Sequence, residues 1–186
     1  MQPEEQYNEF VNHINYLFTK IENDQYTRED YMKGYNLCYN ILTRRDSYEY
    51  VDKMYKVYNK SLSLYAINTI LPKLQHKTGY QLVVEIDISY KKFTKISRRL
   101  NDIMLRLDNF IINHSKLSLK DLSKVIFKEY VYKLIMSQDA LKSNIDNNIF
   151  NDENLNQQLL IMYNDLKIDS KLPIDNTIYQ NFIIEI

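Results

Sequence analysis

The residues that could bind a metal or carry out catalysis are few and widely spaced. The three histidines, His13, His76 and His114, lie far apart, and none belongs to an H-E-x-x-H motif or a comparable ligand pair. The single cysteine, Cys38, has no histidine near it in the sequence, so only the fold could bring a base to it. The spacing therefore predicts neither a metal centre nor a catalytic cysteine.

Two further groups of residues have the types needed for catalysis or phosphate binding but not the arrangement. Glu85 and Asp87 could serve as a general acid and base, but residues two apart on a helix point in different directions. Gly34 and Gly79 are the only glycines, and they lie in different segments, so they cannot form a phosphate-binding loop. We therefore expect no enzymatic activity and no cofactor.

A basic stretch with interleaved aromatic residues is the one pattern that would suit nucleic acid. It contains Lys91, Lys92, Lys95, Arg98 and Arg99, with Tyr90 and Phe93 between them. The aromatic members fall on a predicted apolar stripe, and the chain has 24 basic and 24 acidic side chains, which leaves no net charge. The stretch therefore predicts a solvent-exposed helix face, and nucleic acid is not an expected partner.

The composition favours a soluble, helical, intracellular protein. A single cysteine in 186 residues excludes an internal disulfide framework and indicates a reducing compartment. The amino terminus lacks the features of a signal peptide, and no segment approaches the roughly 20 apolar residues that span a membrane. Two glycines and three prolines are too few for the many tight turns of an all-β protein. We expect an all-α protein in the cytoplasm or nucleus, without a membrane partner.

Apolar residues at spacings of three and four predict a series of helices. Their expected bounds are about 4–22, 27–42, 46–72, 80–113, 118–141 and 154–167. Thr27, Asp46 and Ser118 are the expected amino-terminal caps. Pro72 predicts a break, and the asparagine-rich stretch 143–154 predicts a boundary.

The segment 81–90 could belong to either kind of secondary structure. Its β-branched residues locally resemble a strand. Apolar residues from Ile86 to Phe110 nevertheless continue at helical spacing, which favours one long helix over about 80–113.

The stretch DYMKGYNLCYNI, residues 30–41, places unusual aromatic surface on a helix. One side of that helix would carry Tyr31, Met32, Tyr35 and Tyr39. Other residues suffice for an inward face, namely Leu37, Cys38, Ile41 and Leu42. Apolar stripes at helical spacing are usually core, but surplus aromatic surface marks an interface, so we expect a protein-binding face here.

Three stretches together resemble the amino-terminal region of a cullin, the elongated ubiquitin-ligase scaffold built from five-helix repeats. They are YMKGYNLCYNI at 31–41, SYKKFTKISRRLNDIMLRLDNFIIN at 89–113 and LSLKDLSKVIFKEYV at 117–131. In the tail, LNQQLLIMYNDLK is similar to the closing helix of the repeat, and IYQNFIIEI to the start of the next. The resemblance implies an elongated five-helix cullin repeat over residues 1–150, then the closing helix and the start of a second repeat over residues 151–186.

In cullins the tip of the first repeat binds an adaptor of BTB-like fold that holds the substrate receptor. The contact is made chiefly by the second helix, with help from the segment that LDNFII at 107–112 resembles. The tyrosine-rich second helix of the family matches this chain at Tyr31, Met32, Tyr35, Tyr39 and Asn40. The resemblance implies Tyr31, Met32 and Tyr35 as contact residues, with Tyr39 partly contact and partly core. The Tyr-Met pair favours an F-box-type adaptor over the elongin and BTB-receptor classes.

The same resemblance implies a non-catalytic scaffold. In the family, the RING subunit is recruited by a distant carboxy-terminal domain that resembles nothing in these 186 residues. At this length the protein would bind adaptors without delivering ubiquitin and would act as a competitor, as a viral mimic of a cullin would. As a piece of a longer cullin it would be the receptor-side arm of a ligase.

The sequence departs from the family pattern at two places. Gly34 stands where relatives carry a larger side chain; it costs about 1 kcal/mol of helix propensity relative to alanine, and could let a partner's backbone approach closely. Arg106 and Asn109 stand where other cullins show an aromatic residue and an arginine.

The alternative to a cullin repeat is a viral Bcl-2-like bundle, compact around a central helix, that binds an amphipathic helix of a host protein in a groove. A cullin repeat would instead be slender, with a helix of more than 30 residues.

Overall fold

The computed structural model describes residues 2–77, 79–112, 116–132 and 153–166, and these residues contain helices and no strand. The α-helices are α1 (Pro3–Glu22), α2 (Arg28–Leu42), α3 (Tyr48–Tyr65), α4 (Leu71–Leu74), α5 (Gly79–Ile103), α6 (Leu105–Ile112), α7 (Leu119–Phe127) and α10 (Glu153–Leu166). Two π-helical segments, Ala66–Ile70 and Lys128–Tyr132, follow α3 and α7. The expected all-α fold is confirmed, and the strand-like segment 81–90 lies within α5.

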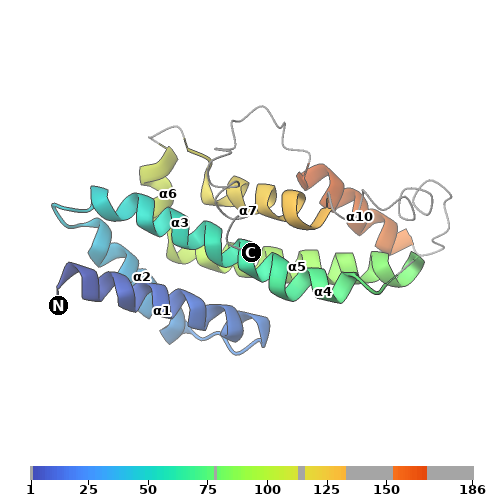
Figure 1. Cartoon of the computed structure of the whole chain (residues 1–186), viewed down its shortest axis with the longest axis horizontal. Helices are drawn as coiled ribbons and strands as arrows, with labels where there is room; N and C mark the ends of the chain where they lie inside the picture. The colour runs from blue at the N-terminus through green and yellow to red at the C-terminus, as the bar shows by residue number, and fades with distance from the viewer. Residues whose placement is uncertain (1, 78, 113–115, 133–152, 167–186) are drawn as a thin grey trace.

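The helices lie side by side in an elongated array (Figure 1). The pair α1 and α2 lies on one side of α3 and α5, while α7 and α10 lie on the other side (Figure 1). α1 packs on α2, α3 and α5, whereas α10 packs on α5 and α7. The long helix α5 therefore joins the amino-terminal pair to the carboxy-terminal helices.

The core runs along the array, as the spacing of apolar residues predicts. In α1, for example, Phe10, Ile14, Leu17 and Ile21 recur every three or four residues and are at most 1% exposed. Tyr58 of α3 is fully buried among these helices. Its hydroxyl lies 2.6 Å from Asn101 Oδ1 of α5 and 3.0 Å from the carbonyl oxygen of Leu119, the first residue of α7. One side chain thus connects three helices.

Two of the three expected caps are confirmed. The Thr27 hydroxyl accepts from the backbone N–H of Asp30 at 3.2 Å, and the Ser118 hydroxyl accepts from that of Asp121 at 3.1 Å. The expected cap at Asp46 is wrong, because α3 begins one residue later, after Ser47. The Asp46 carboxylate instead accepts from Arg44 Nε at 3.0 Å, which draws it away from the helix end.

The expected break at Pro72 is displaced upstream. The chain passes from α3 into the π-helical turn Ala66–Ile70, and the Leu71 N–H bonds back to the Ala66 carbonyl. Pro72 then takes the second position of α4, directly after this turn, and it has no N–H to donate to the helical ladder. The helix is therefore modified before the proline rather than ended at it.

The single helix expected over 80–113 is interrupted at Met104, which separates α5 from α6. Hydrogen bonds continue across the interruption, from Met104 N–H to Leu100 O at 2.9 Å and from Asp108 N–H to Met104 O at 3.1 Å. α6 leaves the line of α5 (Figure 1) and packs against α2 and α3. The change of direction keeps Leu107 and Ile111 of α6 in the core, where both are fully buried.

The last expected elements are described in part. α7 starts as expected, whereas its expected end near residue 141 lies outside the described residues. α10 matches the helix expected at 154–167, and the tail with IYQNFIIEI again lies outside the described residues. The division at residue 150 stays a prediction.

Candidate protein-binding surface

The orientation of α2 is set at its amino-terminal end. Thr27 and Asp30 form a reciprocal cap, in which the Asp30 carboxylate accepts from the Thr27 N–H at 2.9 Å. His13 of α1 is buried and donates through Nε2 to the Asp30 carbonyl oxygen at 2.9 Å. These bonds tie the first turn of α2 to α1, so its faces cannot rotate freely.

The inward face of α2 consists of Gly34, Cys38, Ile41 and Leu42, all buried. A Cβ atom added to Gly34 would lie 3.1 Å from Ile103 Cγ2 and 3.3 Å from His13 Cδ2. Gly34 therefore lets α1 and α5 approach α2 from inside the protein. The expectation that it opens the helix to a partner's backbone is wrong, because the residue faces the core.

The outward face of α2 carries a row of stacked rings, Tyr31, Tyr35 and Tyr39, which we call the tyrosine ladder. The ring centres of Tyr31 and Tyr35 are 5.9 Å apart and those of Tyr35 and Tyr39 are 6.1 Å apart, with interplanar angles of 23° and 25°. Tyr31 and Tyr35 are half-buried, and Tyr31 packs partly against the core. Tyr39 and Met32 are each 42% exposed.

Residues distant in sequence extend the ladder. The Arg106 guanidinium carbon of α6 lies 4.9 Å from the centre of the Tyr39 ring and 6.0 Å from that of Phe110. Phe110 meets Tyr48, the first residue of α3, edge-on at 6.4 Å. Tyr48 is largely exposed. The structure thus joins α2, α6 and the start of α3 into one exposed aromatic surface.

The sequence drew attention to four residues of α2 and, through the resemblance, to the segment 107–112 that contains Phe110, but not to the contact between Arg106 and Tyr39. Arg106 and Phe110 are four residues apart on a helix, which places them on one side of it. That spacing indicates, from the sequence alone, that the two side chains share one side of α6. No local pattern could show that this side would meet Tyr39.

Cys38 lies behind the ladder and is 1% exposed. Burial raises the pKa of its thiol to about 12, although the Leu107 backbone and the Arg106 charge both act in the opposite direction. A thiol with such a pKa is a poor nucleophile near neutral pH. Cys38 therefore acts as a small apolar residue, as the sequence indicated.

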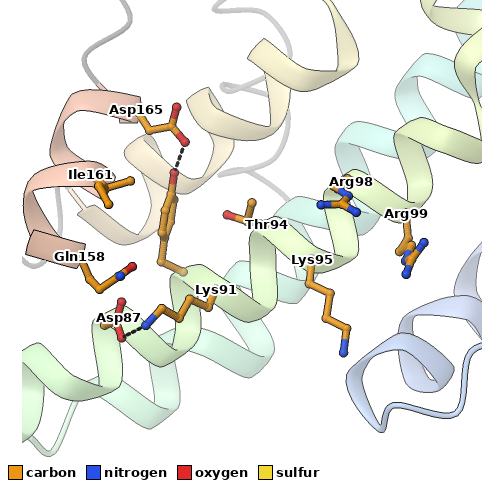
Figure 2. Close-up of a pocket in the computed structure, with 10 residues that line it drawn as sticks. Asp87, Lys91, Thr94, Lys95, Arg98, Arg99, Gln158, Ile161 and Asp165 are labelled. Atoms are coloured by element: carbon orange, nitrogen blue, oxygen red, sulfur yellow. Dashed lines mark hydrogen bonds and ion pairs between the residues drawn. The ribbon is translucent and has the colours of Figure 1, made fainter. Parts of the chain in front are cut away.

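The basic stretch of α5 borders a groove of about 400 Å³ between α5 and α10 (Figure 2). Lys91 pairs with Asp87 at 2.7 Å, and Lys95 pairs with Asp24. In Figure 2, Arg98 and Arg99 lie farther along α5, away from α10. Two of the five basic side chains of the stretch are thus paired with carboxylates of the protein.

The aromatic members of that stretch face inward, as expected. Phe93 is buried, and Tyr90 meets Phe127 edge-on with ring centres 5.0 Å apart. The Tyr90 hydroxyl donates to Asp165 of α10 at 2.8 Å, and Lys124 pairs with the same carboxylate at 3.0 Å. Burial, together with the Asp165 carboxylate, raises the Tyr90 pKa above its usual value. These contacts attach α10 to α5 and α7.

The other candidate chemical groups are separate in space. Glu85 pairs with Lys77 at 2.5 Å, whereas Asp87 pairs with Lys91, so the two carboxylates do not act as a pair. Within residues 2–77, 79–112, 116–132 and 153–166, no three His, Cys, Asp or Glu side chains come together as metal ligands. Nor is any helix in those ranges both long and apolar enough to cross a membrane.

Comparison with known proteins identifies the family of the chain. The chain matches the Cullin alpha solenoid domain over residues 11–185. It is also similar to Cullin-1 of Oryza sativa subsp. japonica, with 30% identity over 114 residues. That match covers 60% of this chain and 15% of the rice protein, so the chain corresponds to a small part of that relative.

The chain belongs to the cullin family, because the family match covers most of its length. Its fold is the cullin-repeat alpha solenoid rather than a Bcl-2-like bundle. In cullins the amino-terminal repeat region is a non-catalytic scaffold region that binds substrate adaptors.

Proposed function

We propose that this chain binds a BTB-fold substrate adaptor of a cullin-RING ubiquitin ligase through the outward face of α2. The contact residues are Tyr31, Met32, Tyr35 and Tyr39, and an F-box-type adaptor is the favoured partner. The observation that carries the proposal is the tyrosine ladder, which stays at the surface although α2 has a complete buried face of its own.

The side chains of this face suit a protein interface. Tyrosine presents a large rigid ring with a hydroxyl for the wet rim, and methionine adapts to an irregular pocket. Because neighbouring rings of the ladder already stack on one another, less side-chain freedom remains to be lost on binding. A partner that covers the ladder would therefore gain apolar contact at a small entropic cost.

The family supports the same location. In cullins the amino-terminal repeat region binds substrate adaptors, and α2 is the helix that resembles the family's adaptor-binding helix. The chain would serve as a non-catalytic scaffold, or as a competitor for the adaptor if it acts by itself.

Calorimetry against a panel of purified BTB-fold adaptors of the F-box, elongin and BTB-receptor classes tests the proposal. The wild-type chain is compared with Tyr31→Ala/Tyr35→Ala and with Tyr80→Ala as the matched control. Tyr80 is 50% exposed and lies in the first turn of α5, whereas α2 contacts α5 at the other end, near Ile103. Circular dichroism checks that all three proteins keep the same helical content.

We expect micromolar or tighter binding to one adaptor class. The double variant should lose at least about 100-fold in affinity, because buried tyrosine anchors commonly contribute 2 kcal/mol or more each. Tyr80→Ala should bind like the wild type. Absence of binding to every adaptor, or equal losses in both variants, would contradict the proposal.

A further inference from the structure

Arg106 places a positive charge within the aromatic surface formed by the tyrosine ladder, Phe110 and Tyr48. Its guanidinium is held between the rings of Tyr39 and Phe110, with its carbon 4.9 Å and 6.0 Å from their centres. Both rings attract the cation and restrict its movement. The half-buried Arg106 side chain is therefore fixed in position before any partner arrives.

The charge of Arg106 has no acidic partner within the part of the chain that the structure describes. Its Nε is buried and makes no hydrogen bond there. Asp108, two residues later, accepts instead from the Leu119 N–H at 2.7 Å. Asp102, one turn earlier on α5, forms no ion pair with Arg106.

The helix opposite Arg106 offers no carboxylate either. From Tyr31 to Arg45 the sequence contains no aspartate or glutamate. The carboxylates of Glu9 and Asp46 already have cationic partners, Lys33 at 3.0 Å and Arg44 at 3.0 Å. Arg106 is thus a partly desolvated cation on an otherwise uncharged aromatic surface, a state that costs free energy until an anion meets it.

We infer that Arg106 is a specificity-determining residue that selects an adaptor with an aspartate or glutamate set within its apolar contact surface, opposite Tyr39 and Phe110. This inference rests on the proposed function, because it describes the partner of the same surface. A carboxylate that pairs with the guanidinium makes charge-assisted hydrogen bonds, while the rings exclude water around them. An adaptor without an acid there leaves the arginine covered and unpaired, which opposes binding.

The test uses the adaptor that binds the wild-type chain and three single variants. Arg106→Met removes the charge and keeps an apolar stem, and Arg106→Lys restores a charge without the planar fork. Arg98→Met is the control, because Arg98 is an exposed arginine of α5 that lines the groove rather than the aromatic surface. On the adaptor, each exposed Asp or Glu is changed singly to its amide.

Arg106→Met should weaken binding about 10- to 100-fold, the usual effect of losing a hydrogen bond to a charged group at an interface. Arg106→Lys should recover part of that loss, and Arg98→Met should have no effect. One amide substitution on the adaptor should weaken binding equally and add nothing in the presence of Arg106→Met. Affinity should also fall with added salt more steeply for the wild type than for Arg106→Met.

The outcomes separate the two proposals. If the wild type binds an adaptor and Arg106→Met binds equally well, the role of Arg106 is wrong while adaptor binding stands. If no single acid of the adaptor couples to Arg106, the inference is overturned in the same way. If the wild type binds no adaptor, the proposed function fails, and this inference fails with it.

Discussion

Gly34 of α2 lies directly against Ile103 of α5, such that a Cβ atom on residue 34 would be 3.1 Å from Ile103 Cγ2 and 3.3 Å from Cδ1. Both residues are buried. The two helices therefore lie close together at a position where α2 has no side chain, with the tyrosine ladder on the opposite face of α2.

Gly34→Leu should lower the free energy of unfolding by about 1–3 kcal/mol, because the added atoms overlap Ile103 and His13 in a packed core. Urea denaturation measures the change. In an Ile103→Ala background the same substitution should cost less, since the side chain it would strike is shortened. Equal costs in both backgrounds would mean that Ile103 does not limit the space at residue 34.

Tyr58→Phe should lower the free energy of unfolding by about 1–3 kcal/mol, because it removes the one hydroxyl hydrogen within reach of the buried acceptors on Asn101 and Leu119. Burial raises the Tyr58 pKa well above its usual value, so the hydroxyl stays protonated as a donor. Tyr39→Phe, at an exposed position where the ring contacts are kept, is the control and should change stability by less than about 0.5 kcal/mol. A Tyr58→Phe protein as stable as the control would show that the Tyr58 hydroxyl makes no net contribution to the free energy of unfolding.

The positions of α1, α2 and α10 could be predicted from sequence, because the spacing of apolar residues is a local property that a single helix retains. The caps at Thr27 and Ser118 are equally local. The π-helical turn Ala66–Ile70 and the interruption at Met104 could not be predicted in this way. They change hydrogen-bond register or direction where one helix packs on another, and residue types in the segment do not encode that.

The candidate surface was predicted in part for the same reason. The outward position of Tyr35 and Tyr39 follows from helical spacing once the inward residues are known. The contact between Tyr39 and Arg106 joins helices far apart in sequence, so it depends on the tertiary packing of α6 on α2. The role of Gly34 was misinterpreted because the sequence alone does not tell which neighbour approaches a glycine.

The cap of α2 should make stability depend on pH. Burial alone would raise the Asp30 pKa, but hydrogen bonds from the Thr27 N–H and hydroxyl outweigh it and hold that pKa below its usual value. A carboxyl whose pKa is lower in the folded state stabilises the fold above its unfolded pKa, about 3.9, and this contribution is lost as the pH falls through the folded pKa. Acidification below about pH 4 should therefore weaken the cap.

Asp30→Asn should lower the free energy of unfolding by about 0.5–1 kcal/mol at neutral pH, and the difference from the wild type should shrink below about pH 4. Glu29→Gln is the matched control, because it removes a charge from the same turn and leaves the capping bonds in place. Denaturation curves across this pH range measure both variants. A constant difference between Asp30→Asn and the wild type at every pH would contradict the linkage.

Cys38 should report whether α2 stays folded against the core and whether a partner covers its outward face. With a pKa of about 12 and 1% exposure, the native thiol should react with a disulfide reagent at about pH 8 at least about 100-fold more slowly than in urea. Labelling then requires local opening of α2.

A bound adaptor should slow the labelling further. It multiplies the ratio of closed to open protein by one plus the adaptor concentration divided by Kd, so the labelling rate should fall by the same factor. Rapid labelling without denaturant would show that α2 opens readily, and labelling unchanged by a bound adaptor would mean that the partner docks elsewhere than on α2.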